Sequence, residues 1–194
     1  MTVSNDSKPV GSSLADPGAL GLGAFALTTF VLSMANAGFV AGAGAAVLGI
    51  ALFYGGIAQL VAGIWEFARG NTFAATAFCS YGAFWLAFWF LVSTKGDAAA
   101  GSAGVGVFLL AWTIFTAYMT IGALKVNGVV LSVFIALTFT FLFLTLGAFG
   151  GSATMSHIGG YLGLLTAVLA WYGSFATVVN STFKRVVLPV MPAK

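Results

Sequence analysis

Six long apolar stretches, separated by short polar or glycine-rich turns, dominate the pattern of residues along this chain. They span about residues 19–40, 45–65, 71–93, 104–124, 129–149 and 157–179, and none contains Asp, Glu, Lys or Arg. Each is at least as long as the roughly 20 residues that a helix needs to cross a bilayer. Membrane-spanning strands would be about half as long and would alternate apolar with polar residues. The pattern therefore predicts an all-α integral membrane protein with six transmembrane helices.

Composition agrees with a membrane location. Of the 194 residues, 60% are hydrophobic and 6% are charged, whereas soluble domains carry roughly 25% charged residues. The single cysteine, Cys79, excludes an intrachain disulfide and a cysteine-based metal cluster. The net charge of +3 does not indicate a nucleic-acid partner, because the basic residues fall at segment ends, as in other membrane proteins. We expect no cofactor and no metal.

The basic residues also predict how the chain is oriented and divided. In a six-helix layout one side collects Lys8, Arg69, Lys125, Lys184, Arg185 and Lys194, and the other side has Lys95 alone. Because basic residues favour the cytoplasmic side, both termini are expected in the cytoplasm of a multi-pass plasma-membrane protein. We expect a flexible arm over residues 1–18, the transmembrane domain over 19–180 and a cytoplasmic tail over 181–194.

Small residues recur along the predicted helices. The chain has 26 glycines, and Gly159 with Gly163, like Ala19 with Gly23, is spaced by four residues. Such pairs allow the backbones of membrane helices to approach closely. Packing within one subunit and assembly with further copies of the chain are both consistent with this pattern.

Polar side chains within the apolar stretches fall on shared helix faces. Phe25, Thr29, Ser33 and Asn36 lie on one face of the first stretch. A second face, in the third stretch, carries Thr72, Thr76 and Ser80. These faces either line a narrow path, or their hydroxyls bond back to carbonyls of their own helix.

A few polar or ionisable residues carry the remaining candidate chemistry. Gln59 lies in mid-stretch, where an unpartnered amide costs several kcal/mol, so it either ties helices together or faces a wet cavity. Glu66 and Arg69 lie at a hinge, where they are expected to form a surface ion pair unless Glu66 carries a proton. His157, the only histidine, either titrates near neutral pH or caps a helix. No spacing of nucleophile, base and orienting group appears, so we predict that the chain is not an enzyme.

The start of the first stretch, "ADPGALGLGAF", predicts a sharply defined helix end. Asp16 suits the N-cap position and Pro17 the first helical position, where no N–H is needed. If this end lies within the fold, its free N–H groups attract a carboxylate. An ordinary capped helix start is the alternative.

Several of these motifs resemble one family, the acetate uptake transporters, or succinate–acetate permeases, of bacteria, archaea and fungi. The runs "FYGGIAQLVAGIWEF" and "RGNTFAATAFCSYGAFW" are similar to the second and third helices of that family. "DPGALGLGAF" resembles its N-terminal signature NPAPLGL. The resemblance implies a helical bundle around a narrow pore in each subunit of a hexamer. It also implies passage of acetate and similar short carboxylates, with succinate in some members.

The resemblance further implies an apolar constriction, which the matching motifs place at Phe25, Tyr81 and Leu137. Ala170 is then expected near Leu137, where both set the size of the substrate, and the Tyr81 hydroxyl is expected to be available to a carboxylate. The candidates for lining the pore or contacting the substrate are Thr29, Tyr54, Gln59, Asn71 and Thr72. Glu66 and His157 are the candidates for proton coupling.

Two positions depart from the family signature, and two other functions stay open. Asp16 stands where the family has Asn, and Ala19 replaces the second proline. The added negative charge disfavours an anion at this end unless Asp16 is paired. A channel for a neutral solute such as urea, ammonia or water also suits an uncharged pore. A membrane scaffold that transports nothing is the third alternative.

Overall fold

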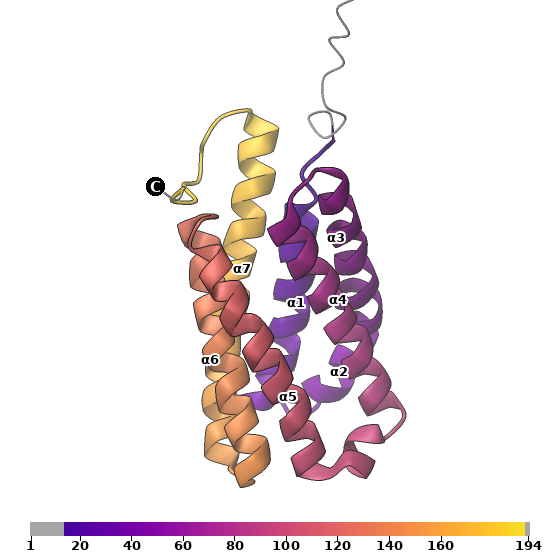
Figure 1. Ribbon diagram of the computed structural model, residues 1–194. Coiled ribbons are helices and arrows are strands. Elements are labelled where there is room, and N and C mark those ends of the chain that lie inside the picture. The colour runs from indigo at the N-terminus through magenta and orange to yellow at the C-terminus, as the bar shows by residue number, and fades with distance from the viewer. Residues whose placement is uncertain (1–13, 193–194) are drawn as a thin grey trace, which may run out of the picture.

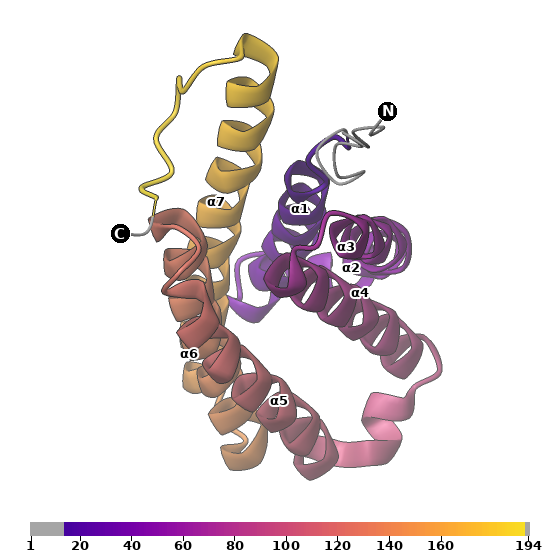
Figure 2. The same ribbon diagram turned by 45° about the horizontal axis from the view of Figure 1, so that its top comes forward.

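The computed structural model describes residues 14–192, and within this range the chain forms a bundle of long helices joined by short turns (Figures 1 and 2). Six of its helical stretches are long and apolar enough to cross a membrane, which confirms the predicted fold class. The helical elements are α1 Gly18–Asn36, α2 Ala43–Ile50, the π-helix η2 Ala51–Ala58, α3 Gln59–Ala68, α4 Thr72–Ser93, α5 Gly96–Ala123, α6 Gly128–Gly150 and α7 Ala153–Phe183.

The element ends refine the sequence-based boundaries. The first helix ends at Asn36 instead of residue 40, because the chain turns there and the N–H groups of Phe39 and Val40 both donate to the Met34 carbonyl. The last helix is longer than expected at both ends. It begins after Ser152, whose hydroxyl accepts a hydrogen bond from the Met155 N–H at 3.3 Å.

The fourth spanning helix has an interruption near its start. Gly101 has φ 63° and ψ −178°, a conformation that only glycine adopts without strain. The short leading segment therefore turns away from the rest of α5, as Figure 2 shows at the junction with α4. The sequence-based start at residue 104 corresponds to the straight part of this helix.

The second span combines α2, η2 and α3, and its middle is a π-helix that the sequence pattern did not predict. This wide segment contains Tyr-Gly-Gly and ends directly before Gln59. It packs against α4, where a Cβ on Gly82 would lie 2.8 Å from the Leu60 nitrogen and 3.0 Å from the Gly56 carbonyl oxygen. Glycine at this contact allows the two backbones to approach closely.

Helix α1 contacts α7, α2, η2, α3 and α4, while α6 packs against α7 and α5. A Cβ on Gly159 would meet Leu144 of α6, and one on Gly163 would meet Ser33 of α1. This glycine pair thus packs within the subunit, one of the two uses left open above.

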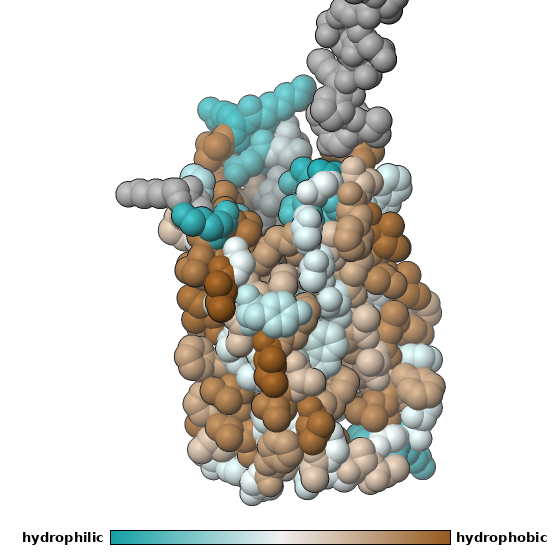
Figure 3. Space-filling view, in the orientation of Figure 1, coloured by the Kyte–Doolittle hydropathy of each residue, from teal (hydrophilic) through white to brown (hydrophobic). Residues whose placement is uncertain are grey.

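The surface divides along the bundle. In Figure 3 apolar residues cover the sides, and the most hydrophilic side chains gather at the end that carries the α3–α4 turn and the end of α7. A cytoplasmic location of this end is the prediction made from the sequence. We call it the inner end, and the end with the α4–α5 and α6–α7 turns the outer end.

Candidate solute pathway

Two cavities lie in line inside the bundle. The larger, of about 300 Å³, is lined by residues of α1, α4, α5, α6 and α7 and reaches the outer end at Asn36, Asp97 and Ser156. The smaller, of about 20 Å³, lies toward the inner end among residues of α1, α3, α4 and α6. Phe25 and Leu137 line both cavities and so separate them.

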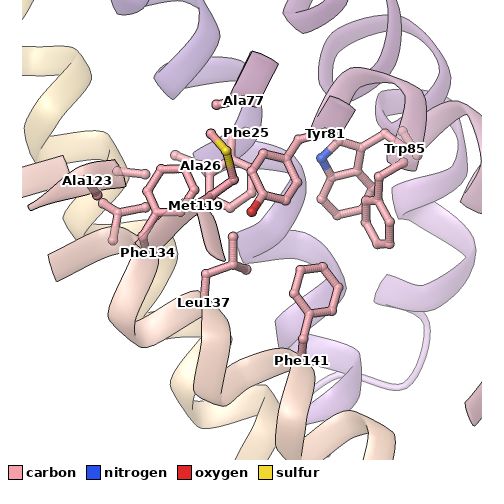
Figure 4. Packing of buried hydrophobic residues seen from close by; sticks show 14 of the residues in the cluster. Phe25, Ala26, Ala77, Tyr81, Trp85, Met119, Ala123, Phe134, Leu137 and Phe141 are labelled. Atoms are coloured by element: carbon pink, nitrogen blue, oxygen red, sulfur yellow. The ribbon is translucent and has the colours of Figure 1, made fainter. Parts of the chain in front are cut away.

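The side chains expected to form the constriction meet at this boundary. Phe25, Tyr81 and Leu137 come from α1, α4 and α6, and each is no more than 5% exposed. The ring centroids of Phe25 and Tyr81 are 5.6 Å apart. Figure 4 shows Leu137 beside the Tyr81 ring, with Phe134 and Met119 close by. The structure therefore brings the three residues together, and we call them the apolar ring.

Tyr81 is held on several sides. Its ring contacts Phe25, Trp112, Phe115 and Phe134, with centroids 5.4 to 6.0 Å apart. Its hydroxyl forms a 2.9 Å hydrogen bond with Thr116 Oγ1 of α5. The hydroxyl expected to be available to a carboxylate is thus already bonded to the neighbouring helix.

The polar face of α1 opens into the outer cavity. Phe25, Thr29, Ser33 and Asn36 all line it, so this face lines a cavity, as one of the two interpretations held. The second predicted face does not do so, because Thr72, Thr76 and Ser80 line neither of the two cavities.

Three buried polar side chains within residues 14–192 have no hydrogen-bond partner, and each belongs to a residue that lines one of these cavities. They are Thr29 Oγ1 and Trp85 Nε1 in the outer cavity, and the amide of Gln59, both of whose polar atoms are unpartnered, in the inner cavity. Gln59 is 1% exposed, so its amide has no bulk water to bond. Because an unpartnered buried polar group costs about 1–3 kcal/mol, such groups at a cavity wall suit a polar guest.

The inner end carries a compact charge cluster at the α3–α4 turn. Asp16 Oδ1 lies 2.9 Å from Arg69 and accepts a 2.8 Å hydrogen bond from the N–H of Gly18, the first residue of α1. The N-cap position is Pro17, one residue later than the sequence predicted. Glu66 lies 3.4 Å from the same guanidinium and is 1% exposed. The negative charge of Asp16 is therefore paired, and Glu66 is buried instead of lying on the surface.

The other candidate residues lie away from the two cavities. Asn71 caps α4 by accepting the Ala74 N–H at 3.2 Å, and Thr72 next to it is exposed. Tyr54 is half-buried near Gly23, and exposed His157 at the outer end lies against Gly38. Ala170 is buried in the same apolar cluster as Leu137.

The described residues offer no site for a metal. Over residues 14–192, no group of three His, Cys, Asp or Glu side chains could hold an ion. The Cys79 thiol instead donates a long hydrogen bond of 3.8 Å to the Leu60 carbonyl.

Comparison with known proteins identifies the family. The profile of the GPR1/FUN34/yaaH family matches residues 2–193. The chain belongs to this family. The succinate-acetate/proton symporter SatP of Escherichia coli (strain K12) is 41% identical over 182 residues, which are 92% of this chain and 96% of that protein. The solved structure of the bacterial acetate channel SatP superposes with a TM-score of 0.86 at 41% identity, covering 92% of this chain and 99% of that one.

Two relatives from Saccharomyces cerevisiae are longer proteins. Accumulation of dyads protein 2 and Ammonia transport outward protein 2 are 44% and 42% identical over 177 residues, or 86% of this chain. The matched residues are 62% of the length of each yeast protein. The resemblance recognised in the sequence, to a family of acetate permeases, is thus confirmed at the level of the family.

Two residues of the site were not singled out from the sequence. Trp85 and Thr116 both lie within apolar stretches, and neither was among the candidate residues. The signal for Trp85 was available, since it lies four residues after Tyr81 and therefore on the same helix face. Nothing in the sequence pairs Thr116 with Tyr81, because they belong to different helices.

Proposed function

We propose that this protein is a membrane channel or transporter for acetate and related short carboxylates, with succinate as a further substrate to test. The observation that carries the proposal is the position of the apolar ring between two cavities that contain unpartnered polar groups. The names of the bacterial relatives, acetate channel and succinate-acetate/proton symporter, support the same substrate class.

In this proposal a short carboxylate occupies the outer cavity, where the Trp85 indole N–H and the Thr29 hydroxyl bond its oxygens. Its methyl group then passes between Phe25, Tyr81 and Leu137, which exclude water and larger solutes. On the inner side the Nε2 amide of Gln59 donates hydrogen bonds to the same oxygens. No charged side chain lines the ring or the inner cavity, so dipoles alone hold the solute there, whereas Asp97 lines the mouth of the outer cavity.

Uptake of labelled acetate into proteoliposomes tests the proposal, with protein-free vesicles subtracted and labelled urea as the control solute. We expect acetate flux that rises in Tyr81→Ala, because the ring is opened, while urea flux stays at the protein-free level. Urea flux without acetate flux would refute the substrate class. Absence of both fluxes in the folded wild type would favour the scaffold alternative.

A neutral solute is the second candidate, because one yeast relative is named for outward transport of ammonia. Ammonia or methylamine efflux from the same vesicles, measured in competition with acetate, separates the two. Acetate that inhibits the amine flux would place both solutes on one pathway.

The wider assignments from the sequence belong to this proposal too. We place the protein in the plasma membrane, the inner membrane of a bacterial cell, with both termini cytoplasmic, and we expect a hexamer with no catalytic activity. The apolar outer faces of α3 and α5, which include exposed Ile64, Phe67, Ile114 and Ile121, are available for neighbouring subunits or lipid. Glu66 and His157 remain the protein groups to test for proton coupling.

A further inference from the structure

One of the hydroxyl pairs that connect neighbouring helices differs from the others, and it includes Tyr81 of the apolar ring. In residues 14–192 four pairs of side-chain hydroxyls bridge two helices: Thr113–Thr145, Thr120–Thr138, Thr140–Thr166 and Tyr81–Thr116. In the first three, both threonines also donate to a carbonyl of their own helix. Such a back-bond uses the one proton of each hydroxyl.

In the fourth pair the direction of the hydrogen bond follows from the other partners of the two hydroxyls. Thr116 donates to the Trp112 carbonyl at 2.7 Å. Either oxygen could donate across the 2.9 Å contact between Tyr81 and Thr116, but both bonds form together only if the tyrosine is the donor, so we assign the proton to Tyr81. The Tyr81 hydroxyl is left with its oxygen lone pairs alone for any other partner.

We infer that Thr116 is a positioning residue of the apolar ring, which turns the Tyr81 proton away from the pathway so that the tyrosine can only accept a hydrogen bond from a passing solute. This inference rests on the proposed function. An undissociated carboxylic acid can donate its O–H to such an oxygen, whereas a carboxylate presents only acceptors and is repelled. The ring accordingly favours the acid over its anion, and the proton crosses with the solute.

The surroundings of Tyr81 agree with passage of a neutral species. Its ring neighbours Phe25, Trp112, Phe115 and Phe134 carry no ionisable group, and neither does any residue lining the inner cavity besides Tyr81 itself. The Gln59 amide in that cavity has an unpartnered donor and an unpartnered acceptor. A carboxylic acid offers the complementary pair, a carbonyl oxygen and an O–H.

The test compares the charge that crosses with the acetate that crosses. Labelled acetate flux and transmembrane current are recorded for the wild type, Thr116→Val, Thr116→Ser and Tyr81→Phe in bilayers of one composition. Thr113→Val is the matched control, because Thr113 lies on the same helix and also makes a back-bond and an interhelical contact.

We expect Thr116→Val to raise the ratio of current to acetate flux roughly fivefold, the factor that corresponds to one ordinary hydrogen bond. In that variant the freed tyrosine proton can donate to the anion. Thr116→Ser and Thr113→Val should keep the wild-type ratio, because both leave the bond between Tyr81 and residue 116 in place. Tyr81→Phe removes the accepting oxygen without providing a donor, so its ratio should rise less than that of Thr116→Val. Thr116→Ala provides a second variant without the hydroxyl if the valine disturbs folding.

The outcomes separate this inference from the proposed function. Suppose that the wild type carries acetate and that Thr116→Val and Thr116→Ala both keep the wild-type ratio of current to acetate flux. That result would overturn the inference and leave the proposed function intact. The inference would also be overturned if Tyr81→Phe raised the ratio as much as Thr116→Val. Loss of the hydrogen bond between Tyr81 and Thr116 would then explain both changes. No acetate flux through the folded wild type would overturn the proposed function, and the inference with it.

Discussion

The outer and inner cavities lie on the two sides of one apolar ring, yet they differ in size and in chemistry. The outer cavity, of about 300 Å³, combines an aromatic wall with one indole N–H and several hydroxyls. The inner cavity, of about 20 Å³, is lined by apolar side chains together with Gln59 and Tyr81. The outer side has room for a solute with water around it, whereas the inner side has room only for a desolvated group. Under the proposed function, this difference predicts that the solute loses its water at the ring.

Opening the apolar ring is expected to have the largest effect on the difference between the two cavities. Leu137→Ala takes away a side chain that lines both cavities, so the two should merge. The cost in unfolding free energy should be about 2–5 kcal/mol, as for other buried leucines. Flux of acids larger than acetate should rise, measured as the ratio of labelled succinate to labelled acetate uptake.

Leu144→Ala is the control for this change, because Leu144 lies on the same helix and lines the outer cavity only. It should enlarge that cavity without altering the preference between the two acids. Equal changes of preference in both variants would show that cavity volume, and not the ring, selects the solute.

Substitution of Gln59 tests the inner cavity. Gln59→Leu removes a buried amide that has no partner, so the protein should become more stable by about 1–3 kcal/mol. Acetate transport should nevertheless fall, with the half-saturating concentration raised roughly tenfold. Thermal unfolding in detergent and labelled uptake give the two values.

The control for Gln59 is Thr28→Val, which removes a buried hydroxyl that is already bonded to the Ala24 carbonyl at 2.9 Å. That variant should gain no stability. A loss of stability in Gln59→Leu would instead favour the interpretation that the amide ties helices together.

Trp85 offers the corresponding test on the outer side. Trp85→Phe keeps an aromatic ring but removes the unpartnered indole N–H, so the half-saturating acetate concentration should rise roughly fivefold. Trp171→Phe is the control, since Trp171 packs against Phe30 and lines neither cavity. An equal rise in the control would mean that the N–H of Trp85 does not contact the solute.

The fold followed from the sequence more completely than the site did. Six helices follow from apolar length alone, because lipid leaves the backbone few other ways to satisfy its hydrogen bonds. The face with Thr29 and Asn36 was correctly grouped by helical spacing. The π-helix before Gln59 was not predicted, because apolar periodicity does not distinguish it from an α-helix within one or two turns.

Contacts between helices account for what the sequence could not show. The bond between Tyr81 and Thr116 joins residues 35 positions apart, and no local pattern encodes it. The resemblance placed Phe25, Tyr81 and Leu137 in one group, and the structure brings them together. Asn71 and Thr72 were candidates for the pathway because of their motif, but the motif serves the α3–α4 turn and the cap of α4.

The smallest expected effect concerns the inner end, where Asp16 occupies the position of the family asparagine. Its partner Arg69 also lies 3.4 Å from Glu66, so Asp16→Asn leaves the guanidinium one carboxylate partner. Because both Asp16 and Arg69 are partly exposed, the loss in stability should be only about 0.2–1 kcal/mol. Without the negative charge of Asp16, acetate influx from the inner side should rise about twofold at low salt and match the wild type at high salt. Asp97→Asn, at the mouth of the outer cavity, should give the same salt dependence from the opposite side. If Asp16→Asn changed influx equally at all salt concentrations, the side chain would act by capping α1 and not by its charge.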